Sequence, residues 1–193
     1  AGKKTMELAG VTPDDIDHVD LYSCFPSAVQ IAATEMELGI DRQLTQTGGL
    51  TFAGGPLNNY VTHSIATMAN VLREEAGAIG LCSANGGYIT KHAFGLYSTT
   101  PPANGFQHED CQTEIDTHPS VELDAEHVGG GTIEAYTVMH GADGPERGLA
   151  SVRTPNGRQW AGTSDLALME SMMVEEHVGR SVQVLPDFSF ELT

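Results

Sequence analysis

Residues 78–97 read AIGLCSANGGYITKHAFGLY, and this stretch decides the fold class. Its first seven residues form a short apolar run, which is typical of a strand buried on both faces of a sheet. The turn signal Asn85-Gly86-Gly87 follows, and residues 88–97 predict a strand that returns beside the first. An amphipathic helix is expected over residues 60–75, directly before the run. Helix, buried strand and returning strand together predict an α/β layer.

The same alternation of strand and helix patterns extends upstream. Residues 16–23, IDHVDLYS, alternate apolar and polar side chains and predict a strand. A helix is expected over 25–38, ended by Gly39, and residues 45–59 predict a glycine-rich loop. We therefore expect an α/β fold with a mixed sheet in the first part of the chain.

Short strands replace this pattern beyond the Pro- and Gly-containing stretch TTPPANG. One helix is expected over 165–176. Strands are expected at 132–140, 148–154, 158–162, 181–185 and 187–192. Closely spaced strands predict a small antiparallel β-barrel. We divide the chain into an α/β half-domain at 1–99, a linker at 100–106 and a barrel domain at 107–193.

The net negative charge of the chain argues against several classes of binding partner. The 193 residues carry 9 Lys and Arg against 26 Asp and Glu, a formal charge of −17, and residues 101–193 contain no lysine. Nucleic acids and anionic membranes both require clustered basic side chains, so we expect neither as a partner. No apolar run approaches the roughly 18 residues of a membrane span. Three widely spaced cysteines predict no disulfide framework and favour a reducing cytoplasm.

Several candidate functional residues lie at strand ends, where α/β sheets commonly carry catalytic or binding side chains. Cys82 ends the apolar strand, and Tyr22 occupies the equivalent place on the first strand. His63 and His92 are candidate proton carriers, and backbone N–H groups of the loop 48–55 could hold an oxyanion. Each of these groups also has a purely structural interpretation. Cys82 can be an inert buried thiol, Tyr22 can cap the core, the histidines can be structural rings with satisfied hydrogen bonds, and the loop glycines can serve tight-turn packing. The remaining histidines show no metal-ligand spacing, so we expect no metal.

Three ordered stretches carry a resemblance to a known family. Residues 20–25, DLYSCF, resemble the His-Asp-Cys-Phe strand end of sterol carrier protein-type thiolases. Residues 48–57, GGLTFAGGPL, resemble the thiolase loop that contains Gly-His-Pro-Leu-Gly. Residues 81–87, LCSANGG, stand where the family has its final Cys or His and glycine turn. Residues 1–99 thus resemble the C-terminal half of a thiolase fold.

The acidic extension widens this resemblance to the thiolase-like proteins of type 1, which are found in actinobacteria. Residues 131–140, with the strands that follow, are similar to the OB-like domains that accompany thiolase-fold enzymes. The resemblance implies an acyl-CoA acyltransferase relative of the acetyl-CoA acetyltransferase type, active in lipid metabolism. It implies a coenzyme A thioester as substrate or ligand, without a further cofactor. It also implies an N-terminal thiolase half with a nucleophilic cysteine, in the same gene product or as a second chain.

By the same resemblance, proton transfer falls to Cys82, Tyr22, His63 and His92. The oxyanion and loop positions are the small or amide-bearing residues Gly54, Gly55, Asn58, Asn85 and Gly86. The sequence departs from the family at two of these places. The Gly-His-Pro histidine falls on Gly55, which leaves the oxyanion hole without its side-chain donor, and a histidine of the strand end is replaced by Tyr22.

These departures leave three readings. The protein is an acyl-CoA acyltransferase relative with a degraded catalytic set, a catalytically silent acyl-CoA-binding or scaffold protein, or an aldolase or lyase acting on a CoA thioester. Because both altered positions belong to the catalytic set, whether the protein is an enzyme stays open at this stage.

Overall fold

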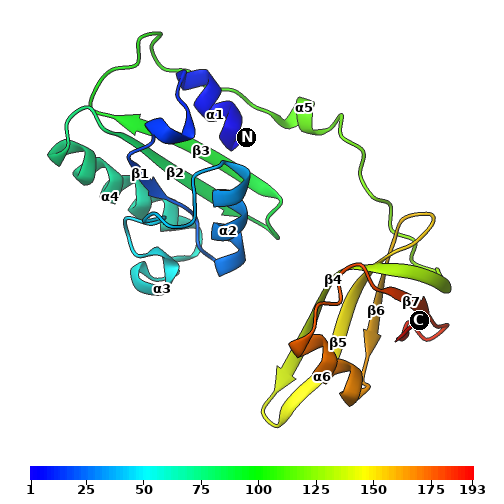
Figure 1. Cartoon of the computed structure of the whole chain (residues 1–193). Helices are drawn as coiled ribbons and strands as arrows, with labels where there is room; N and C mark the ends of the chain where they lie inside the picture. The colour runs from blue at the N-terminus through cyan, green and yellow to red at the C-terminus, as the bar shows by residue number, and fades with distance from the viewer. The chain divides into compact units, whose positions relative to one another are not determined.

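The computed structural model describes residues 1–193, which form two compact units, residues 1–115 and 116–193 (Figure 1). The first unit contains a three-stranded mixed sheet, and the second contains a five-stranded antiparallel sheet. This confirms the expected α/β class of the first part of the chain. The finer boundaries at residues 99 and 107 stay a prediction. No helix of either unit has the length and apolar character needed to cross a membrane.

The sheet of the first unit has the order β1-β2-β3. Strand β1 (His18–Asp20) runs parallel to β2 (Ile79–Gly86), and β3 (Lys91–Ser98) runs antiparallel to β2. Strand β1 is shorter than the predicted strand over 16–23. Past its end, the N–H of Leu21 donates to the carbonyl of Leu44 in a loop, at 2.9 Å, so the chain leaves the strand ladder.

The first unit contains five helices and two 3₁₀ turns. They are α1 (Gly2–Ala9), α2 (Pro26–Glu35), α3 (Gly49–Ala53), α4 (Tyr60–Glu74) and the short α5 (Gln112–Ile115), with 3₁₀ turns η1 (Pro13–Asp15) and η2 (Leu57–Asn59). The stretch 45–59, predicted as a loop throughout, therefore contains α3 and η2. Glycines stand at both ends of this short helix: Gly48 before α3 and Gly54 after it take positive φ angles, which glycine adopts easily.

Alternate residues of β2 pack into two separate apolar clusters. Leu81 packs with Met6 of α1, Ala33 of α2 and Met36, which directly follows α2. Cys82 packs on the opposite face with Met68 and Leu72 of α4. The sheet therefore lies between α1 and α2 on one side and α4 on the other (Figure 1).

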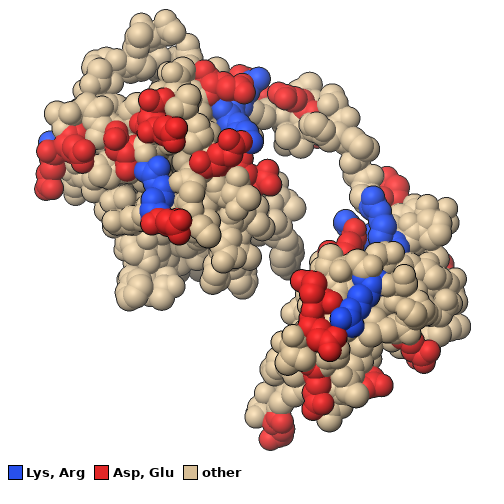
Figure 2. Space-filling view, in the orientation of Figure 1, with Lys and Arg blue, Asp and Glu red and all other residues tan.

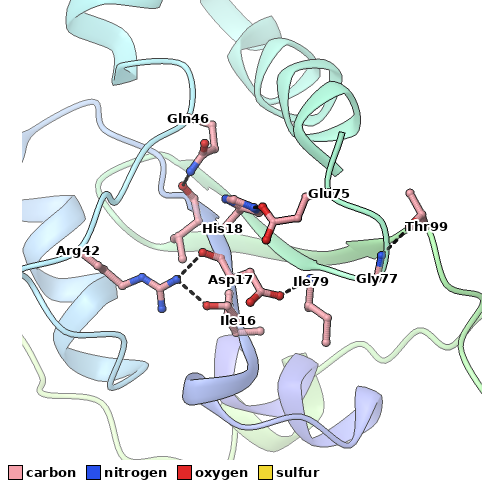
Figure 3. Close-up of polar contacts among 10 residues, drawn as sticks. Ile16, Asp17, His18, Arg42, Gln46, Glu75, Gly77, Ile79 and Thr99 are labelled. Atoms are coloured by element: carbon pink, nitrogen blue, oxygen red, sulfur yellow. Dashed lines mark hydrogen bonds and ion pairs between the residues drawn. The ribbon is translucent and has the colours of Figure 1, made fainter. Parts of the chain in front are cut away.

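Polar contacts fix the beginning of β1, as Figure 3 shows. Arg42 donates to the carbonyl oxygens of the two residues before the strand, at 2.5 and 2.9 Å. The carboxylate of Asp17 accepts from the N–H of Ile79 at 2.8 Å, and His18 lies 2.8 Å from Glu75. These contacts set the register of β1 against β2, and that register decides which side chains meet at the other end of the strands.

The second unit is built from five strands and one helix. They are β4 (Gly129–Gly141), β5 (Gly144–Arg153), β6 (Arg158–Thr163), α6 (Leu166–Val174), β7 (Ser181–Val184) and β8 (Phe190–Leu192). The strand order is β6-β5-β4-β7-β8, and a bridge between Gly162 and Ser189 links the two outer strands. Ile133, Val152 and Phe190 belong to the enclosed apolar core.

Candidate active site at the strand ends

Asp20, at the carboxyl end of β1, is the centre of a buried polar network. Its side chain is fully buried. One carboxylate oxygen accepts from the N–H groups of Gln46 and Thr47 and from the Thr47 hydroxyl, at 2.8, 2.9 and 3.0 Å. The other accepts from the Tyr60 hydroxyl at 2.8 Å. Asp20 therefore ties β1 to the following loop and to the first turn of α4.

The Tyr60 phenol is held neutral within this network. Burial raises the pKa of Tyr60 to about 12, and the neighbouring Asp20 carboxylate adds to the rise, whereas the Thr47 hydroxyl lowers it. The hydroxyl groups of Tyr60 and Thr47 lie 2.6 Å apart. Sequence reasoning did not single out Asp20, Thr47 or Tyr60. A carboxylate at the end of an apolar strand was the available signal, because such a group needs partners when buried.

Cys82 is the register partner of Asp20 on β2. Its side chain is 2% exposed. Burial raises the pKa of the Cys82 thiol to about 11; the Ser64 hydroxyl opposes this rise and the charge of Asp20 adds to it. Cys82 is therefore a thiol at neutral pH, which is a weaker acid than an ordinary cysteine and a poor nucleophile.

Tyr22 lies two residues beyond β1 and packs edge-on against Tyr60, with ring centroids 5.3 Å apart. Its N–H donates to the Ser83 hydroxyl at 2.9 Å. Its side chain is partly exposed, and its own hydroxyl makes no hydrogen bond within the chain. The phenol of Tyr22 is thus an available proton donor at the mouth of the network.

Asn85 and Cys24 form a second pair at the same strand ends. The Asn85 amide donates to the Cys24 sulfur at 3.7 Å, and the amide oxygen of Asn85 is buried without a partner. Cys24 is exposed, in contrast to Cys82. Sequence reasoning named Asn85 as a loop group and passed over Cys24 as a reactive group, although it is the accessible thiol at this end of the sheet.

The glycine-rich loop is anchored beside these groups. The N–H of Leu50 donates to the Ser23 hydroxyl at 2.9 Å. At Gly49, where φ is +72°, a Cβ would lie 2.6 Å from that hydroxyl oxygen, so only glycine fits the approach. Gly54 and Gly55 are exposed, and a Cβ at either would meet nothing within 4 Å. The loop therefore has open space at Gly55, where the resemblance to thiolases led us to expect a histidine.

The other predicted site residues are less closely joined to the network. His63 is exposed on α4, and Asn58 is exposed on η2. His92 is exposed on β3, opposite Asn85, where its ring contacts the carbonyl of Ile89 at 2.9 Å. Gly86 closes β2. The structure thus brings Tyr22, Cys82 and Asn85 to one end of the sheet, whereas His63 and His92 face solvent.

No three His, Cys, Asp or Glu side chains in the chain are arranged to hold a metal ion. The groups at the strand ends are phenols, thiols, a carboxylate and an amide, which can form hydrogen bonds and transfer protons, and Cys24 is an exposed thiol.

Comparison with known proteins shows which family the chain is similar to. Residues 110–188 match the family model of the thiolase-like protein type 1 additional C-terminal domain. The whole chain superposes on a monomeric SCP2-thiolase-like protein type 1 from Mycobacterium smegmatis, with a TM-score of 0.85 and 35% identity. The chain is therefore similar to the thiolase-like proteins of type 1. This confirms the resemblance drawn from residues 20–25, 48–57 and 81–87.

The proteins to which this chain is similar are longer than the chain itself. The match to the Mycobacterium smegmatis protein includes all of this chain but 44% of that chain. A 3-ketoacyl-CoA thiolase of Marinomonas sp. (strain MWYL1) is 34% identical over 87 residues, which are 43% of this chain and 22% of that protein. The chain therefore spans less than half the length of either relative.

Proposed function

We propose that this chain is the C-terminal part of a thiolase-like acyltransferase relative that handles acyl-CoA thioesters with a weakened catalytic set. The observation that carries the proposal is that Tyr22, Cys82 and Asn85 all lie at the same end of the sheet, with the partly exposed Tyr22 phenol free of other hydrogen bonds. A thioester carbonyl placed beside Tyr22 would meet a phenolic O–H donor, which suits an oxyanion developing in acyl transfer. The substrate is assigned by family relationship, since the relatives include a 3-ketoacyl-CoA thiolase.

The state of Cys82 indicates why the activity would be weak. A thiol with a pKa of about 11 is a weak proton donor, and near neutral pH almost none of it is in the thiolate form that could act as a base. Gly55 supplies no side-chain donor. Loss of one oxyanion donor costs a factor of roughly 10²–10³ in rate. We therefore expect slow turnover, with Tyr22 as the acid.

The proposal includes an N-terminal thiolase half, in the same gene product or as a second chain. Strand β3 is an edge of the sheet. Beside it runs a groove of about 1030 Å³ between α1, α2 and residues 102–115. Exposed apolar side chains lie along this groove, among them Ile31 at 49% and Phe106 at 91% exposure. An unpaired edge next to an apolar groove is a surface that a partner layer would bury.

A second candidate, a catalytically silent acyl-CoA-binding or scaffold protein, is favoured by the same Gly55. Without the histidine, the site could hold a thioester without polarising it.

We also propose an OB-like reading of the second unit, supported by its five strands, the β6–β8 bridge and the position of α6 between β6 and β7. We further propose that the protein resides in a reducing cytoplasm, which is supported by its three free cysteines.

The test measures thiolysis of acetoacetyl-CoA by the protein purified with whatever segment or second chain accompanies it in its source. We expect slow turnover that rises about tenfold or more in Gly55→His, because the open loop accepts an imidazole donor there. Tyr22→Phe should lower it. Asp41→His, at an exposed position away from the loop, is the control.

Three other outcomes separate the alternatives. Binding of acetyl-CoA by calorimetry without turnover, also in Gly55→His, would favour the silent protein. Cleavage of a β-hydroxyacyl-CoA without thiolysis would identify a lyase. Neither binding nor turnover with any CoA thioester would contradict the proposal.

A further inference from the structure

The outer face of β5 and β6 concentrates the positive charge of a strongly acidic unit. Residues 116–193 contain 13 Asp and Glu against 4 Arg, a formal charge of −9. Figure 2 shows Asp and Glu spread over both units with far fewer Lys and Arg. Three of the four arginines of this unit, Arg147, Arg153 and Arg158, lie on the two neighbouring strands.

The strand period places these arginines on one face. In β5, Ala150 and Val152 point into the core, so Arg147 and Arg153 point outward. In β6, Ala161 points into the core, so Arg158 and Trp160 point outward. The register pairs Arg153 with Arg158 and Ser151 with Trp160. We call this surface, made of Arg147, Arg153, Arg158, Trp160 and Gly162, the arginine–tryptophan face.

Trp160 lies in the middle of the arginine–tryptophan face. It is the only tryptophan of the chain and is 60% exposed. Along β6, Arg158 lies two residues to one side and Gly162 two residues to the other. The guanidinium of Arg147 reaches across to Gly162, where a Cβ would lie 3.1 Å from its Nε atom. The indole is therefore flanked by guanidinium groups in both directions along the strand.

Two of these guanidinium groups make no direct ion pair with a carboxylate. Arg158 is paired with Glu134, whose carboxylate also accepts from the Ser151 hydroxyl at 2.8 Å. Arg147 and Arg153 are exposed and form no ion pair within 4 Å, although the charge of Arg153 also helps to lower the pKa of Glu134. The acidic second unit thus keeps two guanidinium groups without a direct carboxylate contact beside an exposed indole.

We propose that the arginine–tryptophan face binds a purine nucleotide, with the base stacked on Trp160 and phosphate groups held by Arg147 and Arg153. Exposed indole rings stack on flat aromatic rings, and guanidinium groups bind phosphate in bidentate fashion. The remaining charge of −9 opposes a long polyanion, so a small nucleotide fits better than a nucleic acid. The adenosine phosphate of coenzyme A and a free adenine nucleotide share this chemistry. The proposal does not depend on the strand-end site.

The test titrates the full chain of 193 residues with adenosine 3′,5′-bisphosphate and follows the fluorescence of Trp160, which is the single indole emitter. We expect saturable quenching that weakens with added salt. Arg147→Gln and Arg153→Gln should each weaken binding about tenfold. Gly162→Ala should also weaken it, because a Cβ there displaces the guanidinium of Arg147. Arg180→Gln is the matched control, since Arg180 is paired with Glu175 outside this face.

Parallel titrations identify the ligand. Coenzyme A bound more tightly than adenosine 3′,5′-bisphosphate would assign the face to the cofactor, and equal affinity would assign it to free nucleotides. Adenosine and inorganic phosphate should each bind more weakly than the nucleotide. Absence of quenching and of calorimetric heat with every nucleotide, an equal loss in Arg180→Gln, or tighter binding of single-stranded oligothymidylate would overturn the proposal. Because adenosine 3′,5′-bisphosphate carries no thioester, these results do not depend on acyl transfer.

Discussion

Asp20 and Cys82 are register partners on the parallel strands β1 and β2, and both side chains are buried on the face that α4 covers. Asp20 accepts four hydrogen bonds, from backbone and side-chain donors of the loop and of α4. Cys82 lies among Met68 and Leu72. This strand end therefore joins a carboxylate with several hydrogen-bond donors to a thiol whose pKa burial raises to about 11.

Replacement of Asp20 should destabilise the first unit strongly. Asp20→Ala leaves the buried Tyr60 hydroxyl and the Thr47 donors without their acceptor, at a cost of about 3 kcal/mol of unfolding free energy. Urea denaturation followed by circular dichroism measures the change. Asp41→Ala, at an exposed position, is the control. An equal denaturation midpoint for the two variants would show that the network contributes nothing.

Stability should fall at alkaline pH, because the folded state raises the pKa values of two buried groups. The pKa of Cys82 rises from an ordinary 9.0 to about 11, and that of Tyr60 from 10.0 to about 12. The unfolded chain therefore ionises first. The stabilisation is complete below pH 9 and is lost as the pH rises through 11 and then 12.

Urea titrations at pH 8, 9, 10 and 11 test this expectation. Cys82→Ala should reduce the loss between pH 9 and 11 by about 1 to 2 kcal/mol, because it removes one of the ionising groups. Cys111→Ala, at a position outside the strand ends, should leave the loss unchanged. A pH profile that is the same in Cys82→Ala and in the unaltered chain would refute the role of burial.

The two ends of the glycine-rich loop should tolerate alanine differently. Gly49→Ala forces a Cβ to within 2.6 Å of the Ser23 oxygen at a φ of +72° and should cost about 2 kcal/mol. Gly55→Ala meets nothing within 4 Å and has no positive φ, so its cost should be within about 0.5 kcal/mol. Thermal unfolding compares the two variants, and the reverse ranking would contradict the proposed anchoring of the loop.

Thiol labelling should distinguish the two cysteines of the strand ends. At pH 8 a thiol with a pKa of about 11 is a thiolate in roughly one molecule in a thousand, and Cys82 is also buried. Cys24 is exposed. We expect iodoacetamide, read out by peptide mass spectrometry, to modify Cys24 in the native chain and Cys82 only in urea. Rapid labelling of Cys82 in the native chain would show that the strand end opens.

Several parts of this structure followed from sequence because they depend on local chemistry. The apolar run that became most of β2 carries only one polar side chain, Ser83, so burial in a sheet is its expected place. The alternation in β4 and the turn signal between β5 and β6 likewise predicted strands that the structure contains. The glycine-rich stretch 45–59 was harder, because α3 and η2 are short and depend on glycines with positive φ.

The candidate site depended on both sources of information. Sequence alone identified Cys82, Tyr22 and Asn85, and the family relationship, because these residues stand in ordered motifs at strand ends. Only the tertiary structure decided that Asp20 lies opposite Cys82, since register is set by contacts such as those of Arg42 and Asp17, more than twenty residues from their partners. Burial then set the protonation of Cys82, because desolvation depends on what α4 packs against and no local sequence pattern contains that information.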